Sequence, residues 1–127
     1  MTSRLAAFTE WLTAFGDAWE AGDATGLEPL FTVGATFAPD PFAEVVRRKK
    51  AIVAWFGALF ADFPAARFTA QALGVGDTYG VAHFRVASHD RAVDGVWVVA
   101  LDARGRCESL RAWSSETADK GPIRDSA

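Results

Sequence analysis

The sequence of 127 residues has the length of one domain, and 50% of it is hydrophobic, with five Trp and ten Phe. A net charge of −3 excludes a basic nucleic-acid surface, and a single cysteine excludes an internal disulfide. No apolar run is long enough to predict a membrane span. We therefore expect a cytoplasmic domain that binds neither nucleic acid nor membrane. So many aromatic rings favour a cavity or a subunit interface beside the core.

The N-terminal half has the period of α-helices. Residues 3–21 are amphipathic, and Gly22 suits the left-handed position that follows many helices. Asp23 can cap a short second helix that ends near Phe31. Pro29 lies within this helix and has no backbone N–H to donate. A third helix is predicted over residues 48–63. Its apolar face has i, i+3, i+4 spacing and consists of Ile52, Trp55, Phe56, Leu59, Phe60 and Phe63.

The rest of the chain has the period of β-strands. An extended segment at residues 34–39 leads into Asp40, which the following proline restricts to extended backbone. Segments 66–75, 78–88, 92–102 and 107–115 alternate and predict an antiparallel meander. Helices followed by strands indicate an α+β fold, with three N-terminal helices packed in a strongly curved mixed or antiparallel sheet. We expect a single domain over residues 1–117 and a flexible tail over residues 118–127.

The order of these elements, with Gly22-Asp23 before the short helix and Asp40-Pro41-Phe42 before the aromatic helix, resembles a known superfamily. It is similar to the ketosteroid isomerase-like and SnoaL-like proteins of the nuclear-transport-factor-like, or cystatin-like, cone fold. The resemblance extends from about Leu5 to Glu116. It implies a cone-shaped α+β barrel but not one activity, because this fold carries enzymes, ligand binders and interaction domains.

The resemblance assigns a role to Asp40, because an Asp-Pro at this place supplies the general base of the isomerase branch. That branch also uses hydroxyl and carboxyl donors as an oxyanion hole. The corresponding positions here are Phe15 and Trp97, and a supporting tyrosine corresponds to Phe56. Losing such a donor lowers the rate about 100- to 1,000-fold. The resemblance therefore implies a base without its usual partners, and no steroid isomerase of the usual kind.

Two interpretations of Asp40 stay open. It is a general base or polar ligand anchor, or it is a turn-forming residue that accepts hydrogen bonds from its own backbone. We favour the first, because Phe37, Trp55 and Phe56 are expected to remove water from the carboxylate.

The remaining candidate site residues are rings of the helices and inner-face positions of the strands. Such rings more often form a core than a ligand site, and both interpretations stay open. The candidate ligand-binding residues are Phe15, Trp19, Phe37, Trp55, Phe56, Phe60, Phe84, Trp97, Val99, Ala112 and Ser114.

His83, Arg85, Arg111 and Trp113 alternate onto the opposite face of the sheet. They suit either anion binding or a subunit interface. We favour a homodimer, because no carboxylate or second histidine joins them in the pattern and because Arg and Trp are enriched in interface cores.

No metal-ligand spacing or phosphate-binding loop is present, so no cofactor is expected. Three functions remain. The chain is a cofactor-free isomerase- or cyclase-like enzyme in which Asp40 removes a proton next to a carbonyl of a small hydrophobic molecule, a non-catalytic carrier of such a molecule, or a dimeric interaction module with a closed pocket. A cavity that reaches Asp40 favours the first two, and side chains that fill this space favour the third.

Overall fold

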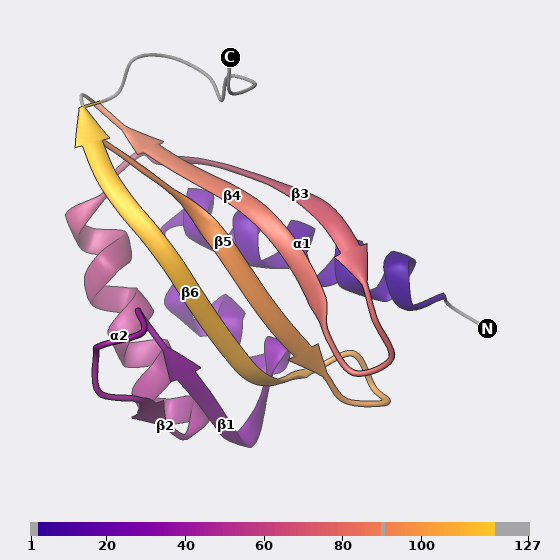
Figure 1. The fold of residues 1–127 in the computed structure, drawn as a ribbon. Helices are drawn as coiled ribbons and strands as arrows, with labels where there is room; N and C mark the ends of the chain where they lie inside the picture. Colours follow the sequence, from indigo (N-terminus) through magenta and orange to yellow (C-terminus); the bar gives the residue numbers. More distant parts are fainter. Residues whose placement is uncertain (1–2, 90, 119–127) are drawn as a thin grey trace.

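The computed structural model describes residues 3–89 and 91–118. It has three helical segments and six strands, and Figure 1 shows the helices on one side of a twisted sheet. In chain order the elements are α1 (Arg4–Ala21), the 3-10 helix η1 (Ala24–Leu30), β1 (Phe31–Ala38), β2 (Val46–Arg47), α2 (Lys49–Asp62), β3 (Arg67–Val75), β4 (Gly80–Ser88), β5 (Arg91–Leu101) and β6 (Cys107–Ala118).

The sheet has the strand order β2-β1-β6-β5-β4-β3 and is mixed and open. Strands β3 to β6 form the predicted antiparallel meander, whereas β1 pairs parallel with β6. The α+β class with three helices against a curved sheet is thereby confirmed. The two-residue strand β2, which pairs with β1, was not predicted, because two residues are too few to show an alternating pattern.

Helix α1 begins and ends as its sequence predicts. The Ser3 hydroxyl accepts the Ala6 N–H at 3.1 Å, and Gly22 has φ of 67° with its N–H directed to the Ala18 and Trp19 carbonyls. The segment after Asp23 is a 3-10 helix that contains Pro29. The predicted tail lies outside the described residues from position 119 onward, and β6 extends to Ala118.

Gly95 allows β5 to lie close to its neighbours at the centre of the sheet. A Cβ atom added there would lie 2.2 Å from the Trp113 carbonyl oxygen and 2.9 Å from Phe84 Cε1. Only glycine fits this approach, which brings the inner-face ring of Phe84 over the middle of β5. No helix in the described part of the chain is long and apolar enough to cross a membrane.

Candidate functional site

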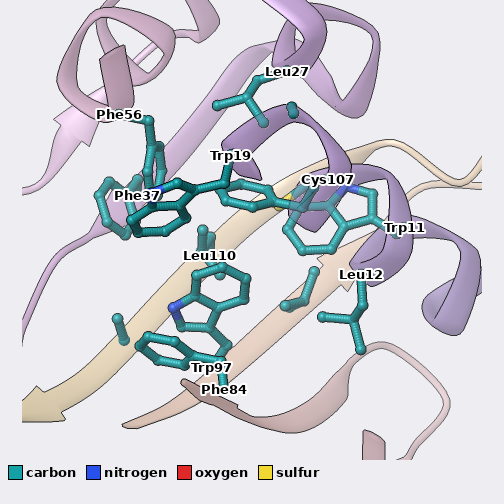
Figure 2. Packing of buried hydrophobic residues seen from close by; sticks show 14 of the residues in the cluster. Trp11, Leu12, Trp19, Leu27, Phe37, Phe56, Phe84, Trp97, Cys107 and Leu110 are labelled. Carbon is teal, nitrogen blue, oxygen red and sulfur yellow. The ribbon is translucent and has the colours of Figure 1, made fainter. Parts of the chain in front are cut away.

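The space between the helices and the sheet is filled by aromatic rings. The Phe15 ring of α1 is fully buried, and its centroid lies 4.9 Å from that of Trp97 and 5.0 Å from that of Phe56. Trp97 in turn stacks on Phe84 at 4.5 Å. Figure 2 shows the rings of α1 facing those of the sheet. Rings from α1, α2 and the sheet therefore contact one another across the interior.

Most of the predicted ligand-binding residues belong to this closed cluster. The buried members are Phe15, Trp19, Phe37, Phe56, Phe60, Phe84, Trp97, Val99 and Ala112. Trp55 and Ser114 do not share this interior. The Trp55 side chain is 36% exposed and packs edge-on against Phe37, and Ser114 is exposed on β6. The structure thus brings together nine of the eleven residues as core, and a ligand-binding role for them stays a prediction.

Two tryptophans of α1 differ in their hydrogen bonding. The Trp11 indole N–H donates to the Leu30 carbonyl oxygen at 2.9 Å. Among the buried side-chain polar atoms of the described residues, the Trp19 Nε1 atom alone has no partner. A buried donor without a partner costs about 1–3 kcal/mol. The interior therefore carries one unused hydrogen-bond donor, beside Phe56 and Phe60.

Asp40 lies outside this interior, on an exposed turn after β1. Its Oδ1 atom accepts the Phe42 backbone N–H at 2.7 Å, and its carbonyl oxygen accepts the Ala43 N–H at 3.3 Å. The expectation that aromatic rings remove water from Asp40 is wrong, because the Asp40 side chain is exposed. The Phe37 and Phe56 rings pack on each other instead, with centroids 4.8 Å apart. The hydrogen bonding is that of the turn-forming alternative, and the catalytic role stays a prediction.

Neither Asp40 nor Trp97 lines either of two hollows on the described surface. The larger, about 880 Å³, lies between the first half of α1 and the β3–β4 and β5–β6 turns. The smaller, about 500 Å³, lies beside Glu20 and Phe68. The sequence interpretation missed the larger one, because it treated residues 102–105 only as a turn and had no means to place that turn beside α1.

Comparison with known families agrees with this architecture. The family model described as a SnoaL-like domain matches residues 12–118. The chain belongs to the SnoaL-like domain family. The match runs from the middle of α1 to the end of β6. The predicted resemblance is therefore confirmed for almost all of the described chain. No curated protein matches the sequence.

Solved structures with the same fold come from proteins of several activities. The epoxide hydrolase/cyclase-like enzyme SalBIII, which has a role in pyran ring formation in polyether salinomycin, is 15% identical, with 88% of this chain and 90% of that chain covered and a TM-score of 0.72. A steroid delta-isomerase from Pseudomonas aeruginosa is 16% identical, with 87% of this chain and 80% of that chain covered and a TM-score of 0.68. An NTF2-like protein of unknown function from Mesorhizobium loti is 21% identical, with 91% and 96% covered and a TM-score of 0.70. At these identities the likeness shows the fold alone.

The outer face of the sheet in this SnoaL-like domain carries the four residues predicted for it. Arg85 Nη1 donates to Asp94 Oδ2 at 2.5 Å, and His83 Nε2 lies 3.5 Å from Asp94 Oδ1. The expectation that no carboxylate joins this group is therefore wrong, because the β4–β5 register places Asp94 opposite Arg85. The Arg111 guanidinium lies 5.7 Å from the centroid of the Trp113 ring.

The SnoaL-like domain offers no reactive thiol at its surface. Cys107 is fully buried at the start of β6, and this burial raises the pKa of its thiol to about 12. Within residues 3–89 and 91–118, no three His, Cys, Asp or Glu side chains gather as metal ligands would.

Proposed function

We propose that this SnoaL-like domain is a non-catalytic interaction module that forms a homodimer through the outer face of its sheet. The observation that carries the proposal is the direct contact of Phe15 with both Phe56 and Trp97, which fills the space that a substrate would occupy. Interiors packed in this way behave as a core, and opening one would sacrifice these contacts.

The position of Asp40 supports a role without proton transfer. A general base must come within hydrogen-bond reach of the proton that it removes, in a site that shields the developing charge from water. Asp40 instead caps the Phe42 N–H at the surface. The two positions that correspond to oxyanion donors carry Phe15 and Trp97, both packed among other rings.

The apolar character of the outer face supports a second copy as its partner. A sheet with one face in water normally alternates apolar and polar residues. Here the outward positions include Val96, which lies opposite the 42% exposed Trp113, and Val98, which pairs with Val81. No helix of residues 3–89 and 91–118 covers this side of the sheet (Figure 1). The valines and the indole therefore form an apolar patch that a partner would remove from water.

The charged groups of the same face are compatible with burial in a dimer. Asp94 pairs with both His83 and Arg85, so these groups would enter an interface with partners in place. Burying a charge that is already paired costs less than burying an unpaired one. Arg111 also lies over the Trp113 ring, an arrangement in which both side chains are held for contact with a partner.

Sedimentation analysis tests the dimer. We expect the wild-type chain to sediment as a dimer at micromolar concentration, and Val96→Glu to raise the dimer dissociation constant at least about 100-fold, because it would bury an unpaired carboxylate. Val33→Glu is the matched control, since Val33 is a strand valine that is 67% exposed elsewhere on the sheet. A monomeric wild type, or equal effects of the two variants, would overturn the proposed interface.

Isomerisation of a β,γ-unsaturated ketosteroid, followed by the absorbance of the conjugated product, tests the absence of catalysis. We expect the wild type and Asp40→Asn to give the same rate as buffer. Turnover by the wild type that disappears in Asp40→Asn would show that Asp40 acts as a base and that the interior opens to substrate.

A further inference from the structure

The larger hollow has the size of a small-molecule site. Its volume of about 880 Å³ falls within the range of roughly 300–1,000 Å³ that such sites occupy. It lies at the end of the sheet where β1 begins, since Pro29 and Leu30 line it, whereas Asp40 follows the other end of β1. This cleft is therefore separate from both Asp40 and the outer sheet face.

The cleft has an apolar floor. Phe8, Trp11 and Val99 line it and are themselves buried, so they present the edge of the core to the hollow. Leu101 is half-buried beside them, and the Tyr79 side chain, 51% exposed, stands at the rim. The exposed Tyr79 ring offers aromatic surface beside this floor, and aromatic contacts of this kind favour ring-containing ligands.

The charges around the cleft are mostly paired. Arg4 Nη1 lies 3.1 Å from Asp77 Oδ1, which links the start of α1 to the β3–β4 turn. Arg106 Nη2 lies 3.2 Å from Asp102 Oδ2. These two pairs shape the walls but leave little net charge for a ligand.

Arg104 is the cation of the cleft that remains available. Its side chain makes no hydrogen bond or ion pair with any residue in the described part of the chain. Its backbone is nevertheless fixed, because Asp102 Oδ1 accepts the N–H groups of Arg104 and Arg106, each at 2.9 Å. These hydrogen bonds also lower the pKa of Asp102 and keep its carboxylate ionised. A free guanidinium is therefore held on a rigid turn at the rim.

We propose that this cleft binds an amphipathic monoanion, in which a ring-containing apolar body lies on Phe8, Trp11 and Tyr79 and a carboxylate or sulfonate pairs with Arg104. The planar guanidinium matches such oxyanions with two parallel donors. Glu10 is an acid in the same lining, on the α1 wall, and it directs the anionic end towards the β5–β6 turn. The start of α1, marked by Ser3, also lies at the cleft and adds the positive end of a helix dipole.

A pair of fluorescent probes with one skeleton tests the proposal. 8-Anilinonaphthalene-1-sulfonate carries a sulfonate, and N-phenyl-1-naphthylamine is the same ring system without it. We expect Arg104→Gln to weaken sulfonate binding about tenfold, as for the loss of one charge-assisted contact, and to leave the neutral probe within about twofold. Arg47→Gln is the control, because Arg47 is an exposed arginine on β2, outside the cleft. Both variants should keep the wild-type urea midpoint.

Amide chemical shifts of the wild-type protein locate the probe without any substitution. We expect the sulfonate probe to perturb the N–H groups of Gly76 and Gly105, which lie in the two turns that line the cleft. Equal weakening of both probes by Arg104→Gln, or no weakening of either, would overturn the anionic class of ligand. Shifts centred on Phe15 and Trp97 would overturn the cleft as the site and would also contradict the closed interior.

Discussion

Separate replacement of Trp11 and Trp19 by phenylalanine tests whether the aromatic interior is a dry core. Both tryptophans belong to α1 and are almost fully buried, at 2% and 4% exposure, so each substitution removes a similar part of a buried indole. The two N–H groups differ, because Trp11 donates to the Leu30 carbonyl at 2.9 Å and Trp19 has no partner among the described residues.

The difference between these variants follows from the hydrogen bonds. Trp11→Phe loses a bond and leaves the Leu30 carbonyl unpaired, which lowers the free energy of unfolding by about 1–2 kcal/mol beyond the loss of ring area. Trp19→Phe removes an unpaired buried donor. This raises the free energy of unfolding by about 1–3 kcal/mol and so offsets part of the loss that comes from the smaller ring area. We therefore expect Trp11→Phe to be less stable than Trp19→Phe by about 2–5 kcal/mol, or roughly 10 °C or more in Tm for a domain of this length.

Urea denaturation followed by far-UV circular dichroism measures this difference, provided that the two variants have equal m-values. If Trp19→Phe is as destabilising as Trp11→Phe, the Trp19 N–H has a partner in solution, such as a buried water or a bound molecule. That result would refute the interpretation of the interior as a dry, closed core.

Three further predictions concern residues outside this pair. Cys107 should not react with Ellman's reagent at pH 8 in the folded protein, because burial keeps its thiol protonated. It should react fully in denaturing guanidinium, and rapid labelling of the folded chain would contradict this prediction. Hydrogen bonds from the Arg106 backbone to Asp102, and from the Arg91 side chain to Glu116, lower both carboxyl pKa values in the folded state. Stability measured as the urea midpoint should therefore fall as the pH drops below about 4.5, and Asp102→Asn should flatten this fall. Gly95→Ala should lower the free energy of unfolding by about 3 kcal/mol or more, because its methyl group would overlap the Trp113 carbonyl, whereas Gly34→Ala, where the added atom meets open space, should leave the melting temperature almost unchanged.

The elements were predictable from sequence because their signals are local. Periodicity located both long helices and the four strands of the meander, and the glycine after the first helix has the left-handed φ that was expected of Gly22. Strand β2 was not predictable, because two residues with Arg47 among them carry no alternation. The parallel pairing of β1 with β6 is also beyond local reasoning, since it joins Phe31 to Cys107.

The candidate site was less predictable, because its features depend on non-local geometry. An Asp-Pro step is compatible with either a base or a turn, and only the fold shows that Asp40 turns to the Phe42 N–H. Helical spacing places Phe15 on an inward face but does not say whether that ring meets a cavity or Trp97. The pairing of Arg85 with Asp94 likewise depends on the β4–β5 register.

The strand order places β6, the last strand of the described residues, between β1 and β5. In a chain folded only as far as β5, β1 would pair with the two-residue β2 alone, and one edge of β5 would have unpaired backbone groups. Insertion of β6 closes both gaps at once, across a separation of about seventy residues, so assembly of the sheet is a late event with a large loop entropy to overcome. We therefore expect both strand edges to stay exposed until β6 pairs, which makes this interval the one most open to wrong strand pairing.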